Sequence, residues 1–309
     1  MRVVFLGTPD FAVESLQAVY DAGHEILAVV TQPDKERNRG VVSFCPVKQR
    51  AVELGLRVLQ FNKIRNEGEE ILRELAPDIM ITCAYGQIIS QSIIDIPKHG
   101  IINVHASLLP KFRGSSPIQW AILTGQTKTG VSIMRTALGI DSGDVLLQKT
   151  IDILPEETAG ELFDRLSELG AKALIEGLEI IQSGNAVYTP QDSSQATHYP
   201  MLSREDGKID WHKSAKEIGW HIRGMNPWPS AFSYIGNKMF KVWKAYPIQD
   251  MSEMDKLEAG QIWTDGKSMI VKCGKGCLQL AEVQLEGKKR MDTKSFLLGN
   301  KLNIGDKLD

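Results

Sequence analysis

Long apolar stretches are missing from this sequence. No run of about 18 apolar residues occurs, which is the length that a helix needs to cross a bilayer. The chain starts with a strand-like run, Val3 to Leu6, and lacks the charged, apolar and small-residue regions of a secretory signal. These absences argue against export and against a membrane anchor, so we expect a cytoplasmic protein.

Cysteine is scarce, with four residues among 309. Without an export signal, free thiols are their expected state. Cys273 and Cys277 lack a second cysteine or histidine pair at zinc spacing, and the glycines between them favour a hairpin turn. No two histidines stand four residues apart, as a helical metal site requires. We therefore expect no metal centre.

A dinucleotide fingerprint and internal repeats are also absent. After the first apolar run the sequence reads Gly7-Thr8-Pro9 and not Gly-x-Gly-x-x-Gly, which disfavours a nicotinamide-dependent dehydrogenase. The composition, with 42% hydrophobic and 24% charged residues, is that of an ordinary globular protein.

What is present is an alternation of strand and helix patterns through the first half. Apolar runs of strand type alternate with apolar residues at helical spacing, over residues 3–6, 10–22, 26–30, 46–55, 78–84, 101–104, 117–123 and 160–181. This alternation predicts an α/β fold, with a doubly wound, mostly parallel sheet covered by helices on both faces. Such sheets bind ligands at the carboxyl ends of their strands.

The second half has a different pattern and charge. Residues 184–202 are polar and aperiodic, and they predict a linker between a domain of residues 1–183 and a smaller β-barrel domain of residues 203–309. Residues 201–309 carry 18 lysines and arginines against 14 acidic residues, or +4, whereas residues 1–200 carry 18 against 24, or −6. A polyanionic partner and chance variation explain this asymmetry equally well.

Reactive side chains gather in the middle of the chain. Asn103 and His105 end an apolar strand at the expected ligand-binding edge, and the two-residue period of a strand puts both on one face. Asp141 follows in a glycine-rich turn. An amide, an imidazole and a carboxylate together can hold an oxyanion and move a proton, as acyl transfer to nitrogen requires. From spacing alone, a structural histidine and a turn closed by aspartate remain open.

Two loops could hold substrates. Residues 107–114 combine an apolar floor with the cations Lys111 and Arg113, which suits a planar ring and an anion. Residues 31–48 form a long connection, and its Arg39 could reach a phosphate. Ordinary solvated loops would have a similar composition.

The sequence resembles the folate-dependent formyltransferases in motifs spread over nearly its whole length. The central pattern is Asn103-Val-His-Ala-Ser-Leu-Leu-Pro-Lys-Phe-Arg-Gly114 with Asp-x-Gly at Asp141. The other motifs are Gly7-Thr-Pro-Asp-Phe-Ala12, Thr31-Gln-Pro-Asp34, Pro117-Ile-Gln119 and Asn226-Pro-Trp-Pro229. The first and second of these, with the tail domain, point to the members that act on tRNA. The resemblance implies a doubly wound N-terminal domain and an OB-like C-terminal barrel.

The activity implied by the resemblance is transfer of a formyl group from the cosubstrate 10-formyltetrahydrofolate to the α-amine of methionine on initiator tRNA. Asn103, His105 and Asp141 become the catalytic residues. The implied folate contacts are Ser107, Leu108, Leu109, Pro110, Tyr85, Gly86, Gln87 and Ile88. The expected tRNA contacts are Arg39, Lys111, Arg113, Lys241, Lys244, Lys288 and Lys289. We expect a monomer.

One departure and one alternative accompany this resemblance. Val41 and Val42 stand where close relatives often carry lysines, which bears on how the 31–48 loop grips tRNA. A formyltransferase acting on an amino sugar nucleotide would share the central motif. A purine-pathway formyltransferase would lack the tail domain, and an inactive tRNA-binding protein would not need the reactive trio.

Overall fold

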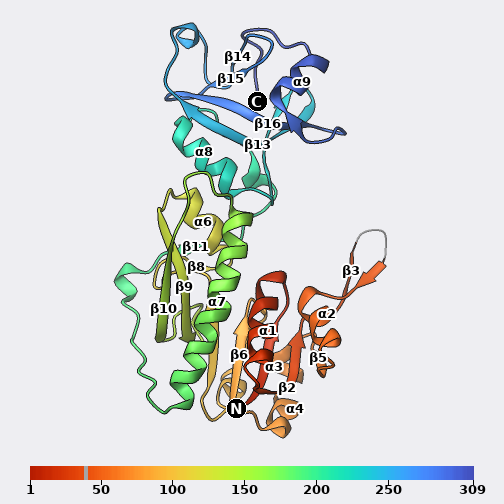
Figure 1. Ribbon diagram of the computed structural model, residues 1–309, viewed down its shortest axis with the longest axis vertical. Coiled ribbons are helices and arrows are strands. Elements are labelled where there is room, and N and C mark those ends of the chain that lie inside the picture. The colour runs from red at the N-terminus through yellow and green to blue at the C-terminus, as the bar shows by residue number, and fades with distance from the viewer. Residues whose placement is uncertain (38–40) are drawn as a thin grey trace. The chain divides into compact units, whose positions relative to one another are not determined.

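The computed structural model describes residues 1–37 and 41–309, which form two units (Figure 1). One unit contains Met1–Pro117, Lys128–Ile151 and Phe163–Tyr199. The other contains Ile118–Thr127, Asp152–Leu162 and Pro200–Asp309. Both units are therefore assembled from segments that are separated in the sequence.

A seven-stranded sheet forms the centre of the first unit, in the order β10-β9-β7-β6-β1-β2-β5. Its strands are β1 (Arg2–Gly7), β2 (Glu25–Thr31), β5 (Val58–Gln60), β6 (Ile79–Cys83), β7 (Ile101–His105), β9 (Lys128–Arg135) and β10 (Val145–Asp152). Neighbouring strands from β5 to β7 pair in parallel, whereas β9 is antiparallel to β7. The predicted α/β fold with a mostly parallel sheet is confirmed.

Helices cover both faces of this sheet because its central strands are apolar on both sides. They are α1 (Val13–Asp21), which follows the short η1 (Asp10–Ala12), α2 (Pro46–Glu53), α3 (Ile64–Glu67), α4 (Glu69–Leu75), α5 (Gln91–Ile94) and α7 (Ala159–Gln182). On one face, Leu72 and Ile93 share a core with Val4. On the other, α7 contacts η1, where Ser167 on α7 donates to the Phe11 carbonyl at 3.0 Å.

The strand order reverses at β1, which has β2 on one side and β6 on the other. Because these strands are parallel, their carboxyl ends meet at one edge of the sheet. Thr8 follows β1 at this edge. Its hydroxyl donates to the Tyr85 carbonyl at 3.2 Å and accepts from the backbone N–H of Gln32 at 3.3 Å. The loops after three strands are thus tied together where ligands bind in such folds.

A hairpin of β3 (Lys35–Arg37) and β4 (Val41–Ser43) leaves this edge. Its base is held by an ion pair between Lys48 and Asp34, whose side chains are 14% and 19% exposed. Gln60 on β5 joins the pair, because its Oε1 accepts from Lys48 at 2.9 Å and its Nε2 donates to Asp34 at 3.2 Å.

Residues 184–199 of the stretch predicted to be a linker belong to the first unit. Thr189 forms a bridge with Val145, and β11 (His198–Tyr199) pairs in parallel with β8 (Arg113–Gly114). Between them lies the short helix η2 (Ser193–Gln195). Residues of this polar stretch therefore form hydrogen bonds with β10 and β8 of the same unit.

The second unit contains an antiparallel sheet in the order β12-β13-β16-β15-β14, with β17 paired to β16. Its strands are β12 (Ala231–Ile235), β13 (Lys238–Ile248), β14 (Ile262–Thr264), β15 (Met269–Lys272), β16 (Cys277–Leu285) and β17 (Met291–Asp292). Its α-helices are α6 (Pro117–Leu123), α8 (Ala215–Gly224) and α9 (Thr293–Gly299). Two short 3₁₀ helices, η3 (Glu205–Gly207) and η4 (Ser252–Met254), complete the unit. Leu308 bridges to Ile235, and Lys307 bridges to Gln261 beside β14. These bridges connect the two edges of the sheet, as the predicted barrel requires.

The turn predicted between Cys273 and Cys277 is confirmed. All four cysteines are free and buried, and residues 273–276 form the turn between β15 and β16. Within residues 1–37 and 41–309, no cluster of three metal-binding side chains is found. No helix in the same residues combines the length and apolar character that a membrane span needs.

Candidate active site

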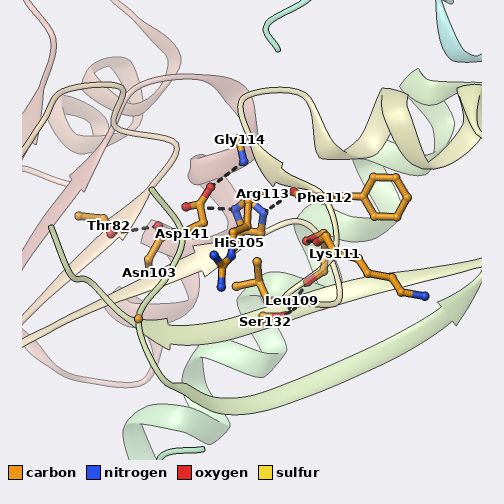
Figure 2. A network of polar contacts seen from close by, with 12 residues as sticks. Thr82, Asn103, His105, Leu109, Lys111, Phe112, Arg113, Gly114, Ser132 and Asp141 are labelled. Carbon is orange, nitrogen blue, oxygen red and sulfur yellow. Dashed lines mark hydrogen bonds and ion pairs between the residues drawn. The ribbon is translucent and has the colours of Figure 1, made fainter. Parts of the chain in front are cut away.

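Strand β7 carries Asn103 and His105 to the carboxyl edge of the sheet (Figure 2). Thr82 on β6 donates its hydroxyl hydrogen to Asn103 Oδ1 at 3.0 Å. This bond orients the amide and leaves the two hydrogens of Asn103 Nδ2 for another acceptor. An oriented N–H donor at this place is suited to stabilising negative charge on a carbonyl oxygen.

His105 is 6% exposed, and both of its ring nitrogens face polar groups. Nε2 lies 3.0 Å from the Phe112 carbonyl oxygen. Because a carbonyl only accepts, Nε2 carries a hydrogen. Nδ1 lies 3.6 Å from Asp141 Oδ1, which is ion-pair distance rather than a close hydrogen bond. The ring is therefore fixed from one side and faces a carboxylate on the other.

Asp141 reaches this position from the turn between β9 and β10. Its Oδ2 accepts the Gly114 N–H at 2.9 Å, and its side chain is 17% exposed. Its φ of 47° lies in the left-handed region, which is uncommon for residues with a side chain, although Asp adopts it more often than most. Gly143 allows the turn to close, because a Cβ there would lie 1.9 Å from the Arg135 carbonyl oxygen.

The three residues predicted to be catalytic therefore lie at one place, although Asp141 is separated from His105 by 36 positions in the sequence. A group between them would meet an amide donor, an imidazole and a carboxylate. This set can stabilise an oxyanion and accept or return a proton.

The proline loop, Ser107–Pro110, is held by a buried serine on β9. Ser132 is 0% exposed, donates to the Ser107 carbonyl at 2.6 Å and accepts from the Leu109 N–H at 3.1 Å. Gln148 Nε2 donates to the same hydroxyl at 2.8 Å. Ser107 Oγ donates to the Lys111 carbonyl at 2.7 Å, so the predicted serine contact already has a partner within its own loop.

The second predicted folate wall, residues 85–88, is mixed in its exposure. Tyr85 is 3% exposed, its hydroxyl has no hydrogen-bond partner among the described residues, and burial together with nearby Glu67 raises its pKa. Gln87 accepts from the Ile64 N–H and donates to the Phe61 carbonyl, at 2.8 and 2.9 Å. Ile88 is 73% exposed. Gly86, also exposed, and Ile88 are thus the members of this wall open to a ligand.

The predicted tRNA contacts near the site differ from one another. Lys111 is exposed. Arg113 is 6% exposed, and its Nε and Nη2 both donate to Gln191 Oε1, at 3.1 and 2.7 Å. This burial disfavours a phosphate contact through Arg113. Arg39 lies outside the described residues.

The predicted tRNA contacts of the second unit lie on and beside the strands of its sheet. Lys241 lies over the Trp243 ring at 5.6 Å, and Lys244 pairs with Glu156 at 3.3 Å. Lys288 and Lys289 are exposed in the turn that follows β16. All four side chains are available to an anionic surface, with Lys244 already sharing its charge with a carboxylate.

Sequence reasoning missed two residues of the site that come from the supposed linker. Gln191 contacts both Arg113 and the Asp141 turn, and Thr197 Oγ1 accepts the Phe112 N–H at 2.8 Å. Neither residue belongs to a periodic or charged pattern. No local signal in the sequence distinguishes them from solvated polar residues.

Comparisons with known proteins agree with this site. The sequence profile described as "Formyl transferase" matches residues 1–178, and "Formyl transferase, C-terminal domain" matches residues 201–301. A methionyl-tRNA formyltransferase from Agathobacter rectalis is 52% identical over 302 residues, which cover 97% of this chain and 96% of that protein. One from Lachnospira eligens is 49% identical over 310 residues, covering 99% and 98%.

Among solved structures, the N-formyltransferase from Helicobacter canadensis, in complex with folinic acid and dTDP-3-aminofucose, has the same fold. Its TM-score is 0.71 at 19% identity, with 91% of this chain and 99% of that chain covered. At this identity the likeness extends to the fold alone. From its two family profiles and its full-length relatives, this chain belongs to the methionyl-tRNA formyltransferase family.

Proposed function

We propose that this enzyme transfers the formyl group of 10-formyltetrahydrofolate to the α-amine of methionine on initiator methionyl-tRNA, producing formylmethionyl-tRNA. The observation that carries the proposal is the distance of 3.6 Å between the Asp141 carboxylate and the His105 ring. His105 lies on β7, the strand that also presents Asn103. The full-length relatives, which are named for this substrate, support it.

The reaction begins when the neutral amine attacks the formyl carbon and the carbonyl oxygen becomes an oxyanion. Asn103 Nδ2 and a protonated His105 Nδ1 donate to this oxygen. One well-placed donor of this kind typically contributes about 10²–10³ in rate. Asp141 accepts the proton that the amine loses, directly or through water. The oxyanion then re-forms the carbonyl, the carbon–nitrogen bond to the folate breaks, and the leaving nitrogen takes up the proton that Asp141 had accepted, directly or through water.

We assign the folate to the space beside the proline loop and residues 86–88. The exposed Ile88 side chain and the partly buried Leu108 and Pro110 offer apolar contact to its rings. No metal takes part in the proposed steps. We assign contacts with tRNA phosphates to Lys111, Lys241, Lys288 and Lys289. Lys244 would make a weaker contact, because it already pairs with Glu156. Arg39 remains a proposed contact of the acceptor end. With such substrates the enzyme acts in the cytoplasm, as a monomer.

The alternative substrate class is an amino sugar nucleotide, because a protein of the same fold was crystallised with one. The deciding experiment offers the enzyme methionyl-tRNA, free methionine and a dTDP-amino sugar, each with 10-formyltetrahydrofolate. We expect formyl transfer to methionyl-tRNA alone, and its loss in His105→Ala with folate binding retained. Transfer to the sugar nucleotide with none to the tRNA would refute the proposal.

A further inference from the structure

Residues 188–199, which we call the strap, contact both sides of the His105–Asp141 pair. The strap is joined to the β9–β10 hairpin by the bridge from Thr189 to Val145, and to the loop after β7 by the pairing of β11 with β8. It thus connects the two segments whose relative position sets the distance between the ring and the carboxylate.

Gln191 holds the turn that carries Asp141. Its Nε2 donates to the Asp141 carbonyl at 2.8 Å and to the Gly143 carbonyl at 2.6 Å. These bonds use both amide hydrogens on acceptors two residues apart. They fix the backbone from the Asp141 carbonyl to the Gly143 carbonyl, directly after the left-handed conformation at Asp141.

The orientation of the Gln191 amide follows from its partners. Arg113 only donates, so the oxygen of the amide faces the guanidinium. The two carbonyls only accept, so the nitrogen faces the turn. Arg113 is 6% exposed and belongs to β8, next to Gly114, whose N–H binds the Asp141 carboxylate. Gln191 therefore links the segment that orients the carboxylate to the turn that supplies it.

The other end of the strap holds the partner of His105. The Phe112 N–H donates to Thr197 Oγ1 at 2.8 Å, and the Phe112 ring stacks on Tyr199 with centroids 5.3 Å apart. The Phe112 carbonyl, in turn, accepts from His105 Nε2. The strap thus binds Asp141 directly, through Gln191, and reaches His105 through one intervening residue, Phe112.

We propose that Gln191 is a positioning residue for formyl transfer, which acts by holding the Asp141 turn against Arg113 and so sets the distance from the carboxylate to His105. The kinetic consequence of this role rests on the proposed function, since Gln191 acts through Asp141. A displacement of about 1 Å in such a site can lower the rate about 10²-fold.

Three variants test this role. Gln191→Met removes all four hydrogen bonds at nearly constant volume. Gln191→Glu keeps the acceptor for Arg113 but loses the two donors to the turn. Gln195→Ala is the matched control, because Gln195 lies exposed in the same strap and its side-chain amide donates to Asp192, within the strap itself. We expect about a 10²-fold lower kcat in both Gln191 variants, with KM for both substrates within about twofold of wild type, and no change in Gln195→Ala.

A spectroscopic measurement tests the geometry without the reaction. In protein labelled with ¹⁵N-histidine, the His105 ring signals are assigned by their loss in His105→Gln. We expect them to shift in Gln191→Met and Gln191→Glu and to stay unchanged in Gln195→Ala. Should Gln191→Met fail to fold, Gln191→Glu alone decides, because it retains the Arg113 contact.

Each outcome distinguishes the role of Gln191 from the proposed function. Wild-type kcat in Gln191→Glu would show that Gln191 serves only Arg113, and would overturn the proposed role. Unchanged His105 signals in folded Gln191 variants would overturn it as well. A wild-type enzyme inactive on methionyl-tRNA would refute the proposed function, and the ring signals would still test the positioning.

Discussion

Replacing Asp141 by asparagine isolates the charge of the carboxylate from its shape. The side chain keeps an oxygen that can accept the Gly114 N–H, now bonded at 2.9 Å. It loses the negative charge that lies 3.6 Å from His105 Nδ1, and it loses the capacity to take up a proton. The variant should therefore fold normally and react slowly.

The expected magnitudes follow from these two distances. Two unit charges about 4 Å apart interact by about 4 kcal/mol at an effective dielectric constant of about 20. Since about 1.4 kcal/mol corresponds to a factor of ten, losing this interaction in the transition state lowers kcat by up to about 10³-fold. Exchanging the charged acceptor of one hydrogen bond for a neutral one should lower the free energy of unfolding by about 1 kcal/mol.

The assay is single-turnover formylation of methionyl-tRNA with saturating 10-formyltetrahydrofolate, together with the folate dissociation constant and a thermal unfolding curve. The matched control is Asp144→Asn, which removes one carboxylate from the same turn and leaves Asp141 in place. We expect a 10²- to 10³-fold lower rate in Asp141→Asn, near-normal folate binding and a near-normal control. A rate within about threefold of wild type would remove Asp141 from the mechanism.

The other predictions concern the surroundings of the site. Ser132→Ala leaves the partners of a buried hydroxyl unsatisfied, so the free energy of unfolding should fall by about 1–3 kcal/mol and KM for folate should rise; an unchanged KM would separate the proline loop from folate binding. Burial alone would raise the pKa of Asp34, but hydrogen bonds, that from Lys48 foremost, hold it below its usual range. The stabilisation by ionised Asp34 is therefore present above about pH 4 and is lost as pH falls through the lowered pKa. The free energy of unfolding of Asp34→Asn should be lower than that of wild type by about 2 kcal/mol at pH 7, and by less in acid. A difference that does not change with pH would contradict this. Lys289→Ala should reduce the slope of log affinity for tRNA against log salt concentration by about one. Replacing Lys256, which is also exposed, by alanine should leave this slope unchanged. Equal slopes in wild type, Lys289→Ala and Lys256→Ala would exclude a phosphate contact at Lys289.

The sequence indicated the fold through local, repeating patterns, and it indicated the proposed catalytic trio through those patterns together with the family resemblance. Apolar strands that alternate with helices specify a covered parallel sheet, and a strand ending in Asn103 and His105 places both side chains on one face at its carboxyl edge. Asp141 was added by the family resemblance, which matches the Asp-x-Gly pattern of its glycine-rich turn. These inferences require no knowledge of distant contacts.

The role of residues 184–199 could not be obtained in this way. Polar, aperiodic sequence is equally compatible with a free linker and with a strap that satisfies buried polar groups. Gln191 bonds to a carbonyl 50 positions away, and Arg113 to Gln191 78 positions away. For the same reason the charge of Arg113 predicted a contact with tRNA at the surface. In the structure Arg113 is buried and donates to Gln191, which is a contact within the protein.

The sequence alone thus determined which chemical groups this protein brings to the edge of its sheet, since strand periodicity and the order of elements are encoded locally. The tertiary structure decided how these groups are held: the left-handed turn at Asp141, the Phe112 carbonyl on His105 and the Gln191 amide between two segments. Such contacts join residues far apart in the chain, and their partners are chosen by the folded backbone rather than by any neighbouring sequence.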